Sequence, residues 1–318
     1  MKITEHLKNS KKTIFSFEII PPLKGKRIEA IYEGIDPLME FNPPFINVTY
    51  HREEYIYKKF PNDLLKKVSI RKRPGTVGIC AAIMNKYNID AVPHLICGGF
   101  TVEETENALI DLQFLGVDNV LALRGDAING EKTFKAEESG HKYAADLITQ
   151  ISNMNKGILL HEESETDAKS HFCIGAAGYP EKHFESMSMR TDIAYLKQKV
   201  EAGADYITTQ MFFDNKKYFD FVALCRGAGI NVPIIPGIKP ITNLRHIAFL
   251  PKTFYVDFPD ALADALMQCK TDAQVSKVGI KWAIEQSQEL LEAKVPCIHY
   301  YTMGKSEEVK AIASEVFV

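Results

Sequence analysis

The chain has 318 residues, of which 46% are hydrophobic and 25% charged, an ordinary composition for a globular protein with ample material for a core. Its formal net charge of −3 gives no reason to expect nucleic acid or an anionic membrane as a partner. The N-terminal residues lack the apolar core of a signal peptide and no run is long enough to span a bilayer, so we expect a cytoplasmic protein.

Short apolar runs that end in polar or glycine residues recur along the chain. Such runs are typical of parallel strands that are buried on both faces. They cover residues 13–20, 45–50, 91–96, 120–123, 172–177, 206–212, 233–237 and 297–301. The pattern therefore predicts eight strands.

Helical patterns occupy the intervals between these runs. Thr101-Val-Glu-Glu104 resembles a capping box and precedes apolar positions at helical spacing, which end at Gly116. Similar spacing predicts helices before Gly203, before Gly227 and from Val275 onward. We expect the densest basic run, residues 66–73, to form a solvated helix face and loop.

Eight strands, each followed by helix, predict a single α/β domain over residues 1–318, a (β/α)₈ barrel with a few extra helices. A doubly wound sheet is the alternative, but it would usually carry a glycine fingerprint after its first strand, where this chain has Glu18 and two prolines. The polar residues 162–170 read as an exposed loop before the fifth strand.

Cysteine and histidine spacing offers no metal site. The six cysteines are scattered without a CxxC pair, which favours free buried thiols in a reducing compartment. His51, His94, His171 and His183 fit no common ligand motif, so we expect no metal.

Polar side chains follow several of the predicted strands. In a barrel the carboxyl ends of the strands meet at the rim where ligands bind. These ends supply Glu18, Thr49, Tyr50, His94, Arg124, Asp126, Tyr179 and Gln210, and the last strand leads to Thr302 and Lys305. The rim is therefore the predicted active site.

Three of these residues suggest specific chemistry. Burial of Glu18 among Phe15, Phe17, Ile19 and Ile20 would raise its pKa and suit a general acid, although a structural ion pair is the alternative. Asp126 would be a fixed anion held by Arg124 or backbone amides, or else part of a tight turn with a surface ion pair. Gln210 offers a donor and an acceptor to a pterin or purine edge, or satisfies a backbone group in the core.

The motifs together resemble methylenetetrahydrofolate reductase in its short bacterial, FAD-dependent form. They follow in order along nearly the whole chain: Phe15-Ser-Phe-Glu-Ile-Ile-Pro-Pro22, Val48-Thr-Tyr50, Pro93-His-Leu95, Leu121-Ala-Leu-Arg-Gly-Asp126, Tyr143-Ala-Ala-Asp146, Ala177-Gly-Tyr-Pro-Glu-Lys-His183, Lys199-Val-Glu-Ala-Gly-Ala204, Thr209-Gln-Met-Phe-Phe-Asp214, Pro236-Gly-Ile238 and Tyr301-Thr302. Their joint order makes the resemblance specific.

The resemblance implies a ping-pong flavoenzyme with non-covalent FAD, in which NADH or NADPH and then 5,10-methylenetetrahydrofolate react in turn and 5-methyltetrahydrofolate forms. It implies that Glu18 is the general acid and that Asp126 lies near flavin and folate. The residues that it assigns to the cofactor pocket are Thr49, Tyr50, His94, Arg124, Gly125, Asp126, Ala144, Tyr179, His183, Ser186, Asp192 and Lys199. The residues that it assigns to the folate or nicotinamide are Gln210, Thr49 and Lys305. The aromatic that it expects to stack on folate falls on Leu250 in the simplest register, so either the adjacent Phe249 stacks or folate is bound more weakly.

Further expectations follow from the same resemblance. Lys199 and the amino end of the helix near Thr191 would meet the diphosphate. A homo-oligomer is expected, and residues 155–170 are longer than the bacterial pattern without an assigned role. The alternative function is a pterin-binding methyltransferase-type barrel without a redox step, and a non-catalytic barrel is a third.

Overall fold

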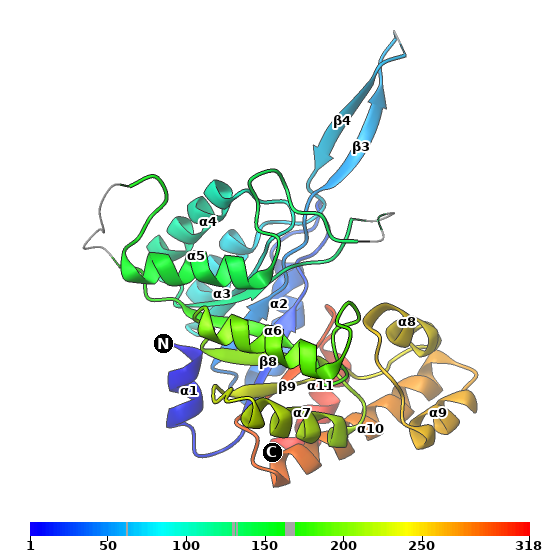
Figure 1. Cartoon of the computed structure of the whole chain (residues 1–318). Coiled ribbons are helices and arrows are strands. Elements are labelled where there is room, and N and C mark those ends of the chain that lie inside the picture. The colour runs from blue at the N-terminus through cyan, green and yellow to red at the C-terminus, as the bar shows by residue number, and fades with distance from the viewer. Residues whose placement is uncertain (62, 129–130, 132, 163–168) are drawn as a thin grey trace.

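Eight parallel strands close into a barrel in the computed structural model, which describes residues 1–61, 63–128, 131, 133–162 and 169–318. The order around the barrel is β1-β10-β9-β8-β7-β6-β5-β2 (Figure 1). The strands are β1 (Ile14–Ile19), β2 (Phe45–Val48), β5 (Asp90–Ile96), β6 (Asn119–Leu123), β7 (Cys173–Gly178), β8 (Tyr206–Met211), β9 (Ile234–Ile238) and β10 (Cys297–Tyr301). Each corresponds to one predicted run, so the predicted (β/α)₈ barrel is confirmed.

Helices cover the outside of the barrel and one end of it. They are α1 (Ile3–Asn9), α2 (Glu29–Ile35), the 3₁₀ helix η1 (Asp36–Phe41), α3 (Thr76–Tyr87), α4 (Val102–Phe114), α5 (Ala144–Lys156), α6 (Met189–Glu201), α7 (Asn215–Gly227), α8 (Leu244–Phe254), α9 (Asp260–Met267), α10 (Asp272–Glu292) and α11 (Glu307–Val316). The predicted capping box begins α4, where the Glu104 N–H donates to Thr101 Oγ1 and the Thr101 N–H donates to Glu104 Oε2. The helices predicted before Gly203 and Gly227 and from Val275 are α6, α7 and α10.

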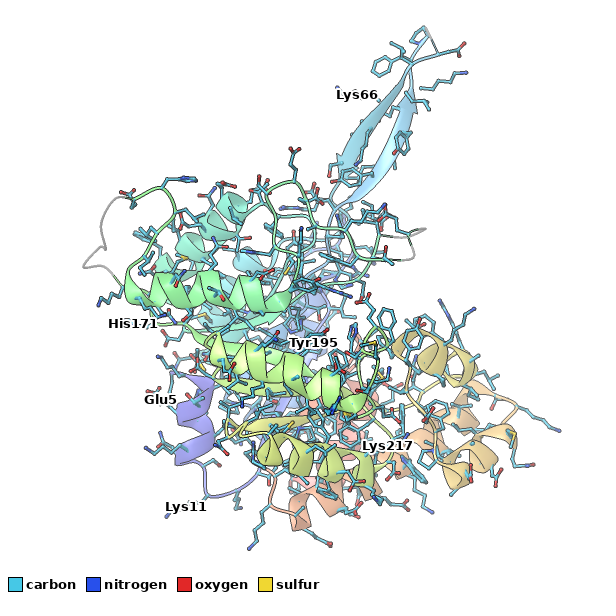
Figure 2. The ribbon with its side chains drawn as sticks, viewed as in Figure 1. Glu5, Lys11, Lys66, His171, Tyr195 and Lys217 are labelled. Carbon is cyan, nitrogen blue, oxygen red and sulfur yellow. The ribbon has the colours of Figure 1, made fainter. Side chains whose placement is uncertain are left out.

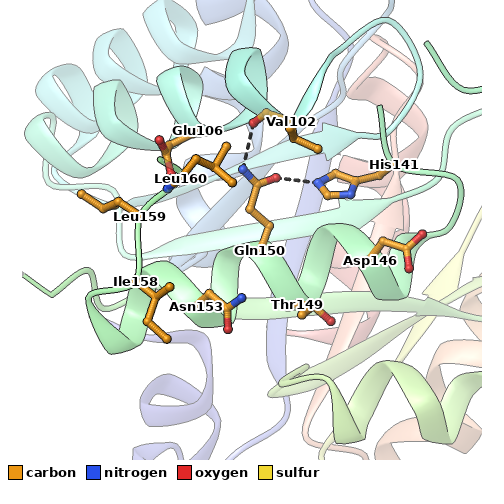
Figure 3. A pocket seen from close by; sticks show the side chains of 10 residues that line it. All are labelled: Val102, Glu106, His141, Asp146, Thr149, Gln150, Asn153, Ile158, Leu159 and Leu160. Atoms are coloured by element: carbon orange, nitrogen blue, oxygen red, sulfur yellow. Dashed lines mark hydrogen bonds between the residues drawn. The ribbon is translucent and has the colours of Figure 1, made fainter. Parts of the chain in front are cut away.

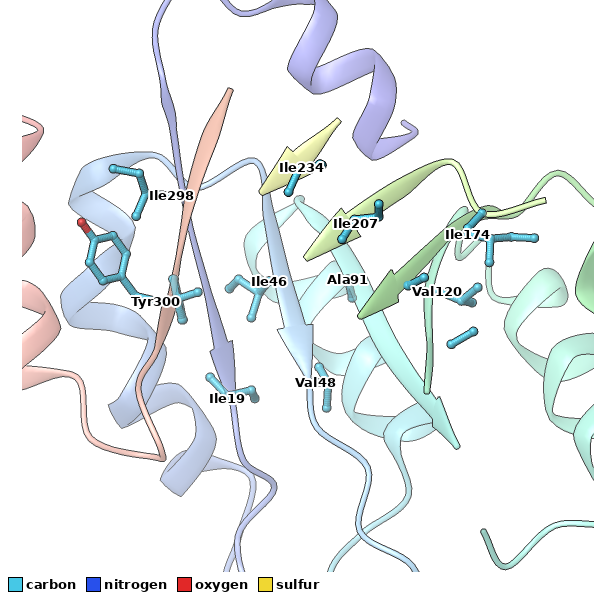
Figure 4. Packing of buried hydrophobic residues seen from close by; sticks show 14 of the residues in the cluster. Ile19, Ile46, Val48, Ala91, Val120, Ile174, Ile207, Ile234, Ile298 and Tyr300 are labelled. Atoms are coloured by element: carbon cyan, nitrogen blue, oxygen red, sulfur yellow. The ribbon is translucent and has the colours of Figure 1, made fainter. Parts of the chain in front are cut away.

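Alternation along the strands divides the core into an outer and an inner part. One set of strand side chains, including Ile46, Val48 and Ile207, packs against the helices (Figure 4). The opposite set fills the amino end of the barrel with an apolar cluster that contains Phe45, Tyr206 and, from α1, Ile3. Helix α1 therefore closes this end of the barrel with apolar side chains.

A hairpin of two antiparallel strands, β3 (Glu54–Lys59) and β4 (Leu65–Ile70), interrupts the alternation of strand and helix. It leaves the chain after β2 and projects away from the barrel (Figure 1). The prediction of a helix face in residues 66–73 is wrong, because Lys66 and Lys67 lie in β4. The prediction that these lysines are solvated is confirmed.

Other expectations meet the structure in part. All six cysteines are free, and all but Cys269 are buried. The predicted loop before β7 falls partly on residues 163–168, which lie outside the described residues. Within the described ranges, no helix is both long and apolar enough to cross a membrane.

Candidate active site

The carboxyl ends of the barrel strands bring the predicted catalytic residues to one rim. Glu18 lies near the end of β1 and Gln210 near the end of β8, and Asp126 follows β6. The strands are parallel, so these ends share one face of the barrel. The expectation that segments far apart in sequence meet at a common edge is therefore confirmed.

Glu18 is buried at the inner side of the rim. Its side chain shares the interior with His94, whose Nε2 lies 3.8 Å from Glu18 Oε2. Burial raises the pKa of Glu18 to about 7, and the nearby Thr49 hydroxyl and the Lys239 ammonium oppose part of that rise. The Thr49 hydroxyl nevertheless makes no hydrogen bond of normal geometry with any described residue. A carboxyl with this pKa can be protonated at neutral pH.

The origin of this pKa differs from the one predicted. Phe15, Phe17 and Ile19 belong to the outer core, because neighbouring residues of a strand point to opposite faces. The carboxyl is instead enclosed by the polar residues of the barrel interior. The direction of the predicted shift is confirmed, but those apolar neighbours are not its cause.

A layer of buried polar side chains lies beneath Glu18. Ser16 Oγ and His299 Nδ1 share a hydrogen bond of 2.9 Å, and Asn47 Nδ2 lies 3.4 Å from His94 Nε2. Burial lowers the pKa of both histidines to about 3, so both are neutral at physiological pH. His299 Nε2 and Asn47 Oδ1 have no partner among the described residues. The layer can therefore accept or relay hydrogen bonds below the carboxyl.

Lys239 is a further rim residue that sequence reasoning missed. It directly follows β9, is only 4% exposed, and has its pKa lowered to about 8 by burial. Its charge acts on Glu18. The same rule that selected the other strand ends would have found it. Ser16, Asn47 and His299 were missed because they lie inside strands, where only the closed barrel decides which residues face inward.

Asp126 is exposed and is not held by Arg124. Arg124 donates from Nη1 to Glu185 Oε2 at 2.5 Å and lies over the Phe134 ring, so the expected Arg124–Asp126 contact is replaced by another ion pair. Gly125, between them, has a φ of +83°, and a Cβ there would lie 3.3 Å from Ile96. The glycine thus permits the turn that presents the Asp126 carboxylate at the rim.

Gln210 lies at an irregularity of the barrel. The register of β8 against β9 shifts between Thr208 and Met211, as a β-bulge does, and bulges commonly redirect side chains at active sites. Gln210 Oε1 accepts a hydrogen bond of 2.9 Å from the Met211 N–H. The side-chain nitrogen makes no hydrogen bond within the described ranges and is available to a ligand.

The segment after β7 contains five of the twelve predicted cofactor residues: Tyr179, His183, Ser186, Asp192 and Lys199. Asp192, in the first turn of α6, accepts hydrogen bonds from Ser186 Oγ at 2.7 Å and from the His183 N–H at 3.2 Å. The rings of Tyr179 and His183 meet edge to face, 4.8 Å apart. The Lys199 Nζ donates to the Ala177 carbonyl at 3.0 Å, and burial lowers its pKa to about 8.

The two elements expected at the diphosphate are separated along α6. Lys199 lies ten residues after Met189, about 15 Å along the helix axis. Its long side chain extends back toward the carboxyl end of β7, where it contacts the Ala177 carbonyl. Contact of both elements with one ligand remains a prediction.

The remaining predicted residues flank this rim. Thr49 and Tyr50 follow β2, the Tyr50 ring lies 5.2 Å from Phe100, and Ala144 begins α5. Lys305 is exposed beyond β10. Leu250 is buried in the cluster under α8, whereas Phe249 is partly exposed with Arg245 over its ring. The role of Phe249 as the residue that stacks on folate stays a prediction.

A hollow of about 210 Å³ lies outside the barrel, between α4 and α5 (Figure 3). Gln150 closes its wall by contacting His141 Nε2 at 2.5 Å and donating to the Val102 carbonyl at 2.8 Å. None of the predicted site residues lines it, so the barrel rim is the candidate active site. Within the part of the chain that the structure describes, no group of three or more potential metal ligands is found.

Comparison with known sequences identifies relatives over the whole barrel. The family model described as methylenetetrahydrofolate reductase matches residues 2–316. The 5,10-methylenetetrahydrofolate reductase of Escherichia coli is 32% identical over 298 residues, covering 93% of this chain and 88% of that protein. Methylenetetrahydrofolate reductase (NADH) 1 of Arabidopsis thaliana is also 32% identical, over 96% of this chain but 49% of its own length. The chain spans about half the length of the plant and yeast relatives.

Among solved structures, an uncharacterized protein from Clostridium thermocellum that binds two copies of 5-methyl-5,6,7,8-tetrahydrofolic acid aligns with a TM-score of 0.58. Its sequence identity is 15%, and the alignment covers 99% of this chain and 98% of that one. At this identity the likeness supports the fold alone. The family model and the E. coli relative decide the family: the chain belongs to the methylenetetrahydrofolate reductases.

Proposed function

We propose that this protein reduces 5,10-methylenetetrahydrofolate to 5-methyltetrahydrofolate, with NAD(P)H as the hydride source and a non-covalently bound FAD as the carrier, in a ping-pong cycle. One barrel domain would hold all three ligands at its rim. The observation that carries the proposal, beyond family membership, is the buried Glu18 carboxyl with a pKa of about 7 at the carboxyl end of β1.

Reduction of the methylene bridge requires a proton donor. The five-membered folate ring opens to an iminium when a folate nitrogen is protonated, and an acid with a pKa near the working pH does this best. Glu18 meets that requirement. His94 remains neutral beside it, so it does not hold Glu18 in the ionised state by its charge.

Asp126 is suited to the cation that forms on the folate. A carboxylate at the rim would stabilise the positive charge of the iminium, and a fixed anion beside a flavin would tune the flavin's reduction potential. Gln210 would orient the pterin, and later the nicotinamide carboxamide, through its available side-chain nitrogen. Phe249 would stack on the folate, and Lys305 would lie near it.

The residues after β6 and β7 fit a dinucleotide cofactor. Lys199 is half-buried and its described hydrogen-bond acceptor is a neutral carbonyl, and its lowered pKa indicates a site where an anionic phosphate would be favourable. Arg124 adds a second cation near it, and Thr49 offers a buried hydroxyl without a partner in the described structure. When bound, FAD would supply the two-electron chemistry, taking up a hydride from NAD(P)H and delivering one to the folate.

The test separates the two half-reactions by anaerobic stopped-flow spectroscopy of protein reconstituted with FAD. NADH and NADPH, tried separately, should bleach the flavin absorbance, and methylenetetrahydrofolate should restore it. Glu18→Gln should leave the bleaching step nearly unchanged but slow the folate step by about 10²–10⁴-fold, the usual contribution of a general acid. Glu33→Gln, a change of the same kind on an exposed helix position, is the control.

Two results would contradict the proposal. Protein that neither contains FAD nor takes it up, but binds folate, would favour the methyltransferase-type alternative. Equal loss of both half-reactions in Glu18→Gln would contradict the proposed role of Glu18 as a general acid that serves the folate step alone.

A further inference from the structure

The β3–β4 hairpin exposes an unusual amount of apolar surface. Large hydrophobic side chains stand exposed along it and at its tip: Tyr57 (66%), Leu64 (64%), Leu65 (64%), Phe60 (46%) and Ile56 (38%). Monomeric proteins rarely gather such side chains on one protruding element, and a gathering of this kind marks an interaction surface.

The hairpin also lacks the support that a sheet needs. It contains only two strands, and neither pairs with the barrel. An isolated two-stranded ribbon is marginally stable in water, and each of its outer edges presents unpaired backbone groups. A protein surface that covered the hairpin would bury its apolar side chains and could form hydrogen bonds with the backbone groups at its open edges.

Charge indicates which kind of surface would cover it. Residues 53–73 contain seven lysine and arginine side chains and three acidic ones, an excess of four positive charges, so the other residues of the chain carry a formal −7. Lys58 and Lys66 lie directly opposite each other across the two strands, an arrangement that is destabilising for like charges. No described acidic side chain pairs with either lysine. Figure 2 shows the Lys66 side chain on the projecting hairpin, far from the body of the barrel.

A suitable partner therefore carries a net negative charge and exposes some apolar surface. We propose that the hairpin is an arm that docks on the body of a second copy of this chain, with the two arms exchanged about a two-fold axis. The body of the same chain supplies the acidic balance that the arm lacks, and a two-fold arrangement satisfies both arms at once. An arm of this length, together with the surface around its base, approaches the 20–30 residues per partner that a specific interface uses.

The first test removes the arm. Tyr55 and Ser69 are directly paired, so replacing residues 56–68 with an Asn-Gly turn closes the ribbon at that pair without moving its base. Light scattering of the full chain should give a particle mass that is a multiple of 35.8 kDa. The shortened chain should form particles with at most half as many chains. Circular dichroism checks that the barrel is intact. Because no substrate is present, this outcome is independent of the proposed function.

The second test keeps the arm and reverses its charge. Lys58→Glu with Lys66→Glu preserves a like-charge pair in the ribbon but would repel an acidic partner, so the dissociation constant should rise about tenfold or more. The same two-lysine reversal at Lys277 and Lys281, exposed on α10, should have no such effect. A monomeric full chain at micromolar concentration, an unchanged mass in both arm variants, or binding of the monomer to RNA or anionic vesicles would overturn the proposal.

Discussion

Replacing Glu18 with glutamine should stabilise the protein, and increasingly so as the pH rises. Folding raises the pKa of this carboxyl from 4.5 to about 7. Between these values the unfolded chain has released the proton that the native state still holds, so the carboxyl makes native stability decline as the pH rises. At 1.36 kcal/mol for each pKa unit, the decline reaches about 3 kcal/mol above pH 7.

Glutamine has nearly the same shape and no charge at any pH, so the variant lacks this decline. The free energy of unfolding of Glu18→Gln should therefore exceed that of the wild-type protein by about 2.5 kcal/mol more at pH 8 than at pH 5. Urea unfolding of the ligand-free protein, at one fixed protein concentration, measures this difference. Glu33→Gln controls for loss of a negative charge at the surface. An equal difference at the two pH values would refute the conclusion that the native carboxyl retains its proton.

Three further changes test the barrel interior. Lys239→Met removes a charge that lowers the pKa of Glu18. The rate of the folate half-reaction, measured over a pH series, should therefore decline at higher pH than in the wild-type protein. An unchanged pH profile would show that Lys239 does not act on Glu18. Tyr206→Phe deletes a buried hydroxyl that has no hydrogen-bond partner in the described structure. The free energy of unfolding should therefore rise by about 1 kcal/mol. A less stable variant would mean that the hydroxyl makes a hydrogen bond in the native protein. Gly175→Ala places a Cβ against the Tyr206 ring and should lower the unfolding free energy by about 1–3 kcal/mol, and wild-type stability would show that the ring can move aside.

The barrel could be predicted from sequence because its strands are buried on both faces. Burial turns each strand into a short apolar run, and the count of runs then selects the architecture. The hairpin has no buried face that would create such a run. Its apolar residues and its lysines stand in separate consecutive groups, Tyr55-Ile56-Tyr57 before Lys58-Lys59 and Leu64-Leu65 before Lys66-Lys67, without the alternation of a half-buried strand. The basic residues among 66–73 therefore suggest a solvated helix instead.

The rim residues could be predicted in part for a similar reason. A polar residue at the end of an apolar run is visible in the sequence, which is how Glu18, Asp126 and Gln210 were found. The side-chain partners of the rim residues are harder to predict from the sequence. Arg124 pairs with Glu185 from a segment 61 positions away, and no local pattern reports such a contact.

The closed amino end of the barrel has a kinetic consequence. Apolar side chains from α1 and the strands fill that end, so a proton that passes between Glu18 and solvent would have to use the carboxyl end of the barrel, where the proposed ligands would also enter. A bound folate would then stand between the carboxyl and water. Reprotonation of Glu18 would then have to follow product release. A solvent isotope effect on turnover would report how strictly product release precedes reprotonation.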